Sequence, residues 1–130
     1  MDQKKYIPLN KLEVYLLARE LSKSAWIIYS EMTWEVKKTI GFQFIESTDS
    51  VGANIAEGYG RFHYLDKVKF YYNSRGSLLE SRHWYELLEE RKLLTNSIKT
   101  NYLSSYKQLR PALNSLVKNT LNQLTEKKIT

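Results

Sequence analysis

Apolar side chains recur at three- and four-residue steps along most of this chain, which is the spacing of amphipathic helices. Four segments carry the pattern, at about 10–31, 34–58, 66–93 and 96–124. The chain contains only 2 prolines and 5 glycines, which favours long helices over a sheet protein with many turns. The sequence therefore predicts one all-α domain spanning 1–130, built as an antiparallel up-down four-helix bundle.

Several residues suit the ends and interruptions of these helices. Asn10 can cap the first helix as part of a capping box, and Thr33 can cap the second. We expect Gly58 and Gly60 to end the second helix in the left-handed conformation, which glycine adopts readily. Pro111 lies inside the fourth apolar stripe, so we expect a kink there or a split into two helices.

The segment at 66–93 is apolar on two opposite sides. A helix of this kind is expected to be buried on two faces, whereas a helix of an isolated bundle turns one face to solvent. We therefore expect the second side to form an oligomer interface, where tyrosine, tryptophan and arginine are enriched, unless these side chains simply lie along the surface. The residues of this second side are Val68, Tyr71, Tyr72, Leu78, Leu79, Arg82 and Tyr85.

Composition restricts the environment and the kinds of site. The chain has no cysteine, which excludes disulfides and thiolate metal sites and makes a reducing cytoplasm the simplest location. Its longest apolar runs are too short to span a bilayer, so no membrane partner is expected. The sequence therefore predicts a cytoplasmic protein.

Positive charge is concentrated in the C-terminal quarter. The net charge is +6, and residues 96–130 hold six basic residues and one acidic residue. Five cations fall within about 100° of arc on a helical wheel, namely Lys99, Lys107, Arg110, Lys118 and Lys128. We expect this face to bind a polyanion through charge and shape rather than base sequence, the alternative being an ordinary solvated helix face.

A set of polar residues lies at the expected seam between the second and third helices. Its members are Asn54, Glu57 and Arg61 on one helix and Arg75, Ser77 and Glu80 on the next. Partly buried charges are costly unless they are paired, so we expect a hydrogen-bonded network that fixes the register of the two helices. The alternative is that Glu57 and Glu80 are the acid–base pair of an enzyme.

Templates for cofactor chemistry are incomplete. Glu80 and His83 form one Glu-x-x-His pair on a helix, whereas a di-iron bundle needs two such pairs and two further carboxylates. The segment from Gly58 to Gly60 lacks the Lys-Ser/Thr of a phosphate loop and follows a helix rather than a strand. The sequence therefore predicts neither a metal site nor a cofactor.

Two motifs carry a resemblance to a known family. They are NIAEGYGR, from Asn54 to Arg61, and RGSLLE, from Arg75 to Glu80, which adds Gly76 to the motif residues. With them, the chain from Asn10 to Leu121 resembles the four-helix-bundle proteins encoded by intervening sequences of bacterial 23S ribosomal RNA genes, the S23 family. Accessory proteins of diversity-generating retroelements belong to the same group. The resemblance implies a homopentamer and favours RNA as the nucleic acid.

These observations lead to three expectations of function. The first is a non-enzymatic oligomer that binds nucleic acid, which the resemblance implies is structured RNA, or that acts as a scaffold. The second is a structural or protein-docking oligomer without a nucleic-acid ligand. The third is an enzyme that uses Glu57 and Glu80, which we expect least because structural ion pairs also occupy helix seams.

Overall fold

The computed structural model describes residues 6–129, except for the side chains of Ile98, Thr100 and 127–129. In this part of the chain every regular element is helical and no strand is present, which confirms the all-α prediction. The elements are η2 (Leu9–Lys11), α1 (Glu13–Ser30), α2 (Trp34–Val36), the π-helical turn η3 (Lys37–Gly41), α3 (Phe42–Tyr59), α4 (Tyr64–Glu90) and α5 (Asn96–Ile129).

The segments α2, η3 and α3 form one continuous helical rod, which is the predicted second helix. The residues on both sides of η3, Val36 and Phe42, keep right-handed helical backbone angles. Thr33 caps the rod as predicted, because its Oγ1 accepts a hydrogen bond of 3.3 Å from the Val36 N–H. Gly41 fits beneath Met32, whose Sδ would lie 2.7 Å from any Cβ added there.

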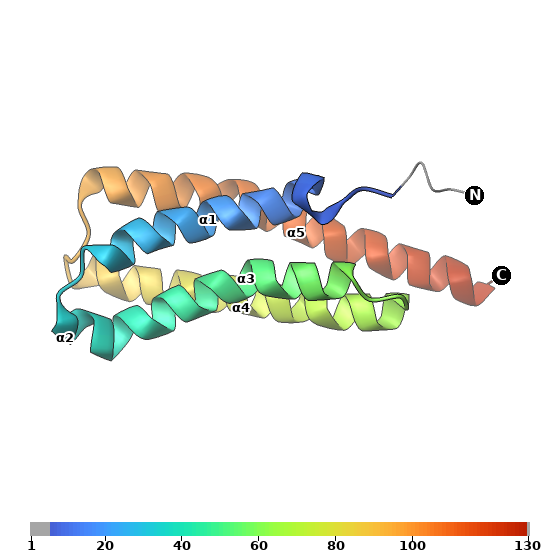
Figure 1. Ribbon diagram of the computed structural model, residues 1–130, viewed down its shortest axis with the longest axis horizontal. Coiled ribbons are helices and arrows are strands. Elements are labelled where there is room, and N and C mark those ends of the chain that lie inside the picture. Colours follow the sequence, from blue (N-terminus) through green and yellow to red (C-terminus); the bar gives the residue numbers. More distant parts are fainter. Residues whose placement is uncertain (1–5, 130) are drawn as a thin grey trace.

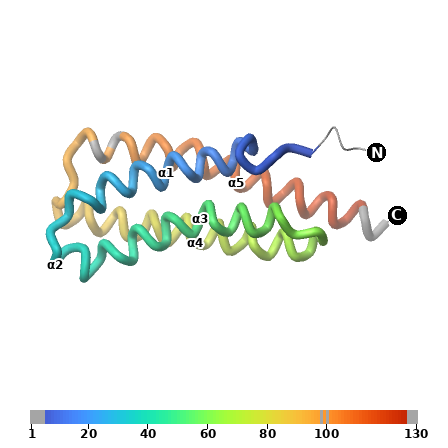
Figure 2. Tube along the Cα trace, viewed as in Figure 1, coloured from blue at the N-terminus to red at the C-terminus, as the bar shows by residue number. Residues whose placement is uncertain are grey.

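The four rods form the antiparallel bundle that the sequence predicts. Each packs against two others, so that α1, α3, α4 and α5 follow one another around the core. Successive rods run in opposite directions, as the ribbon and the Cα trace both show (Figures 1 and 2). The α3–α4 connection lies at the same end of the bundle as η2 and the last turns of α5, and the α4–α5 connection lies at the other (Figure 1).

Two predicted helix ends are wrong. Helix α1 begins at Glu13 rather than near Asn10, because Asn10 belongs to the 3-10 turn that follows Pro8, and Leu12 occupies the N-cap without a side-chain bond. Gly58 and Gly60 do not adopt the left-handed conformation, since no glycine in the described chain has a positive φ. Gly60 still follows the last residue of α3, with φ −79° and ψ −9°.

Helix α5 continues through Pro111 without a break, so the predicted split does not occur. Figure 1 shows the helix changing direction along its length. Because proline has no backbone N–H, the Lys107 carbonyl cannot receive the usual helical hydrogen bond from residue 111. Pro111 itself is exposed on the outer side of α5.

The core combines aliphatic residues with stacked aromatic rings. The rings of Tyr85 and Tyr102 lie 4.2 Å apart and nearly parallel, and Phe44 packs 5.7 Å from Tyr102. Burial raises the pKa of Tyr71 and Tyr85 to about 12, and it also raises the pKa of Tyr102. These phenols therefore stay protonated near neutral pH.

A chain of buried hydroxyl groups crosses this core. Thr48 donates to the Phe44 carbonyl at 2.7 Å, so its oxygen must accept the 2.6 Å hydrogen bond from Ser81. Ser81 in turn accepts from the Tyr102 hydroxyl at 2.8 Å. The chain joins α5, α4 and α3, and it fixes the relative positions of the three helices.

Candidate nucleic-acid interface

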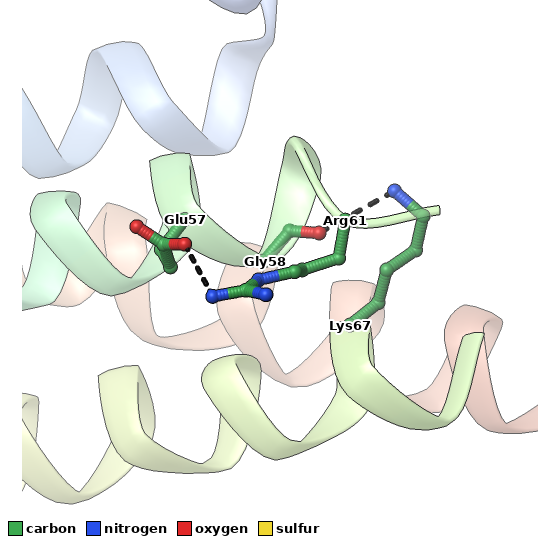
Figure 3. A network of polar contacts seen from close by, with 4 residues as sticks. All are labelled: Glu57, Gly58, Arg61 and Lys67. Carbon is green, nitrogen blue, oxygen red and sulfur yellow. Dashed lines mark hydrogen bonds and ion pairs between the residues drawn. The ribbon is translucent and has the colours of Figure 1, made fainter. Parts of the chain in front are cut away.

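The motif NIAEGYGR forms the corner where α3 ends and the chain turns into α4. Glu57 and Arg61 make an ion pair of 2.7 Å within this motif, and the Arg61 guanidinium carbon lies 4.8 Å from the Phe70 ring centroid of α4. Figure 3 shows Lys67 reaching back from α4, where its Nζ donates to the Gly58 and Tyr59 carbonyls at 3.4 and 2.8 Å. Partial burial lowers the pKa of Lys67.

Gly58 is required at this corner by close packing rather than by backbone angle. A Cβ added there would lie 2.7 Å from Tyr71 Cε1, which is closer than such atoms approach, and 3.0 Å from Phe70 Cβ, which is a tight contact. The glycine therefore lets α3 and α4 meet at their shared end. The other motif glycine, Gly76, has no heavy atom within 4 Å of such a Cβ.

The predicted polar network between α3 and α4 does not form. Asn54 donates to the Ser50 carbonyl of its own helix, Arg75 lies over the ring of Tyr72, and Glu80 accepts from Trp84. No hydrogen bond or ion pair in the described chain joins the predicted residues of α3 to Arg75, Ser77 or Glu80. Asn54, Arg75 and Glu80 instead find partners three or four residues away on their own helices, because residues at this spacing share a helix face.

Away from the corner, where Lys67 binds the Gly58 and Tyr59 carbonyls, the polar contacts between α3 and α4 come from small hydroxyl residues that were not predicted. Ser74 donates to the Val51 carbonyl at 2.8 Å, and Ser81 binds Thr48. Their sequence signal is positional: Ser74 and Ser81 continue the stripe of Tyr71, Leu78 and Tyr85 at helical spacing.

The two carboxylates of the enzyme hypothesis lie far apart along the bundle. Gly58 packs against Tyr71 and Thr48 bonds to Ser81, so Glu57 lies near one level of α4 and Glu80 near another. The nine residues of α3 between these levels correspond to about 13 Å along the axis. The pair cannot act on one substrate atom as acid and base.

The predicted oligomer interface on α4 is wrong for four of its residues. Val68, Tyr71, Leu78 and Tyr85 are buried inside the bundle, because this side of α4 faces α3 and α5. Tyr72 and Leu79 do stay on the surface, with 42% and 60% of their area exposed. Arg82, the remaining member of the set, is half-buried beside α5.

The cations predicted on the last helix divide into paired and unpaired groups. Lys99 lies 3.7 Å from Glu89 at the start of α5, and Lys128 lies outside the described side chains. Lys107, Arg110 and Lys118 are exposed and make no ion pair with any side chain that the structure describes. Residues 96–124 contain no carboxylate at all.

Two of the unpaired cations border a depression between α4 and α5, which we call the basic hollow. It has a volume of about 300 Å³, and its lining consists of Arg82 from α4 with Leu103, Tyr106, Lys107, Arg110 and Pro111 from α5. Arg82 lies over the Tyr106 ring at 4.9 Å and pairs with Glu86 at 3.0 Å. The hollow thus combines three cations with one nearby carboxylate, an arrangement suited to an anion.

Comparison with known proteins agrees with this architecture. The family model described as 23S rRNA-intervening sequence protein matches residues 10–115. The chain belongs to this family. The resemblance carried by the two sequence motifs is therefore confirmed.

A solved structure shows the same fold as this 23S rRNA-intervening sequence protein. It is a protein with unknown function of the S23 ribosomal protein family from Bacteroides thetaiotaomicron, which aligns with a TM-score of 0.70 at 19% identity. The alignment covers 81% of this chain and 98% of that one. No curated protein matches the sequence.

Across the described residues, no group of three or more histidine, cysteine, aspartate or glutamate side chains is placed to hold a metal ion. None of the helices in that part of the chain is long and apolar enough to cross a membrane.

Proposed function

We propose that this protein is a non-enzymatic nucleic-acid-binding protein, with structured RNA as its ligand and α5 as its binding face. The observation that carries the proposal is the basic hollow, where Lys107 and Arg110 have no described acidic partner. Lys118 extends the same face by about 12 Å beyond Arg110 along the helix axis. Exposed cations without carboxylates neutralise phosphates and release counterions, so the binding energy depends on salt.

The proposed mode of recognition is charge and shape. Lysine and arginine on the outside of a helix contact phosphates, which fix position but carry no base information. Membership of a family described by its 23S rRNA intervening sequences favours RNA over DNA. A cytoplasmic location fits such a ligand.

A salt series with a labelled RNA hairpin tests this proposal. We expect the logarithm of the affinity to fall with the logarithm of salt concentration, with a slope of about −2 to −3 per subunit for three cations. Lys107→Glu with Arg110→Glu should weaken binding by on the order of 100-fold at low salt. Lys11→Glu with Lys38→Glu changes net charge equally at exposed positions elsewhere, and should retain most of the affinity.

The outcomes separate specific from general charge effects. Fluorescence anisotropy measures the affinities, and circular dichroism should show that both double variants keep the wild-type spectrum. Equal loss of affinity in the two would mean that net charge alone drives association. Absence of RNA binding by the wild type at low salt would overturn the proposal.

A second candidate function is a homo-oligomeric or protein-docking scaffold, and the family resemblance favours a pentamer. Exposed apolar residues support it: Tyr72 and Leu79 lie on the outer side of α4, with the open position Gly76 between them. Sedimentation at micromolar concentration should show an assembly that Leu79→Glu weakens, whereas Glu80→Gln should not. A monomer at all concentrations would exclude this candidate.

A further inference from the structure

The basic hollow differs from a flat row of surface cations because half of its lining is apolar. Leu103, Tyr106 and Pro111 form this half, beside the charged groups of Arg82, Lys107 and Arg110. Tyr106 is buried with its ring against Arg82, while Pro111 is exposed at the rim. A ligand that fills the hollow must therefore offer an anionic part and an apolar, flat part together.

Arg82 is held in position by its neighbours. Its Nε donates to Glu86 at 3.0 Å, and its guanidinium lies 4.9 Å from the Tyr106 ring centroid and 5.9 Å from that of Tyr85. The hydrogen bond to Glu86 uses only Nε, so it leaves the donors on the two terminal nitrogens of Arg82 for another partner. A side chain held in this way loses little conformational entropy when a ligand binds.

The size of the hollow selects among forms of RNA. Its volume of about 300 Å³ lies at the small end of ligand sites, which span roughly 300–1,000 Å³. A fully paired helix keeps its bases stacked inside and offers mainly phosphates and ribose to a convex protein surface, which would leave the apolar half unfilled. An unpaired nucleotide offers a phosphate and a free base face at once.

We propose that the basic hollow binds one unpaired nucleotide of an RNA, an inference that rests on the proposed RNA-binding function. Lys107 and Arg110 bind the phosphate on the exposed side. The base lies against Leu103 and Pro111, where the Arg82 guanidinium stacks on it or donates to its edge. Lys118 contacts the flanking backbone and gives no preference between paired and unpaired RNA.

The test compares two RNA hairpins that share the same tight loop of stacked bases and differ only in the stem. One stem is fully paired, and the other carries a single-nucleotide bulge. At about 0.15 M salt, where general charge attraction is screened, anisotropy should give roughly ten-fold tighter binding of the bulged hairpin, as one base–aromatic or base–guanidinium stack would supply.

Three variants locate the preference. Arg82→Lys keeps the charge but removes the planar group, and Pro111→Ser removes the ring while restoring an N–H that suits a helix. Each should reduce the bulge preference to about three-fold or less while affinity for the paired hairpin stays within two-fold. Lys118→Gln is the matched control and should weaken both hairpins equally.

A direct probe needs no RNA duplex. Adenosine monophosphate titrated into the wild-type protein should shift the NMR signals of Leu103 and Tyr106, whereas inorganic phosphate should shift mainly those of Lys107 and Arg110. Equal binding of the two hairpins, with adenosine monophosphate acting like phosphate, would overturn the nucleotide site and leave the RNA-binding function standing. Failure of both hairpins to bind at low salt would overturn both, and equally good competition by an acidic peptide would assign the hollow to a protein.

Discussion

The α3–α4 corner and the basic hollow both gather charged and aromatic side chains at a helix–helix junction, yet they use them in opposite ways. At the corner, Arg61 pairs with Glu57 and Lys67 binds two backbone carbonyls. At the hollow, Arg82 has a carboxylate partner, while Lys107 has none among the described residues. At the corner, the charged side chains are already bound to other groups of the protein. At the hollow, Lys107 can still bind a ligand.

This difference shows that a recognisable motif and a ligand site need not coincide. The glycine and charged residues of the motif at the corner allow the chain to turn and the two helices to pack together. The residues of the hollow form no motif in sequence, because Arg82 lies 21 positions before Leu103. Binding capacity follows from which cations the fold leaves without a carboxylate.

The largest expected effect concerns packing at the corner. Gly58→Ala should lower the free energy of unfolding by about 1–3 kcal/mol, because its Cβ would overlap Tyr71 and force α3 and α4 apart. Urea unfolding followed by circular dichroism measures this change. Affinity for RNA, measured where both proteins are folded, should stay near that of the wild type.

Gly76→Ala is the matched control for that substitution. It lies in the interior of α4, and its added Cβ meets no atom within 4 Å. The alanine should therefore raise the free energy of unfolding by about 0.5–1 kcal/mol, as in any exposed helix. A loss of stability at both glycines would contradict the packing explanation of Gly58.

A smaller effect is expected in the core between the two regions. Ser81→Ala removes the acceptor of the Tyr102 hydroxyl and the donor to Thr48, and should cost about 1–2 kcal/mol of unfolding free energy. Ser77→Ala, at a half-buried position of the same helix, should cost little. Equal effects on thermal unfolding would show that the hydroxyl chain contributes nothing.

The sequence was sufficient to predict the helices because their apolar spacing is regular over long segments. The rod from Trp34 to Tyr59 and its Thr33 cap follow from local chemistry alone. The unbroken course of α5 through Pro111 does not, because a proline inside an apolar stripe predicts a kink or a split. The start of α1 was not predictable in the same way. Pro8 and Asn10 are compatible with either a cap or a 3-10 turn, and the turn forms here.

The candidate site was only partly predictable, for a geometric reason. Charge counting identifies Lys107 and Arg110, since they share one side of a helix that lacks carboxylates between 96 and 124. Arg82 escapes such counting because its role depends on α4 lying beside α5. The side of α4 that faces inward was also misassigned, since both of its sides carry aromatic residues and periodicity alone cannot choose between them.

Two arginine substitutions sharpen the contrast between the regions. Arg110→Gln should lower RNA affinity roughly five-fold at about 0.1 M salt and reduce the salt slope by about one, because one phosphate contact is lost. Arg61→Gln removes the same charge at the corner and leaves every cation of the hollow in place, so the affinity for RNA should fall less than two-fold. Anisotropy across a salt series distinguishes them, and reversed magnitudes would move the binding face to the corner.

The smallest effect is expected for Glu57→Gln. Its carboxylate pairs with Arg61 one turn away, and both side chains are about half exposed, so solvent screens the attraction. The free energy of unfolding should therefore fall by at most about 0.5 kcal/mol, and raising the salt concentration should reduce even that difference. The glutamine leaves Arg61 without its carboxylate partner beside Phe70. The RNA affinity of this variant therefore also tests whether an unpaired cation at the corner attracts RNA. A change in affinity comparable with that of Arg110→Gln would mean that pairing, rather than position beside the hollow, decides which cations bind.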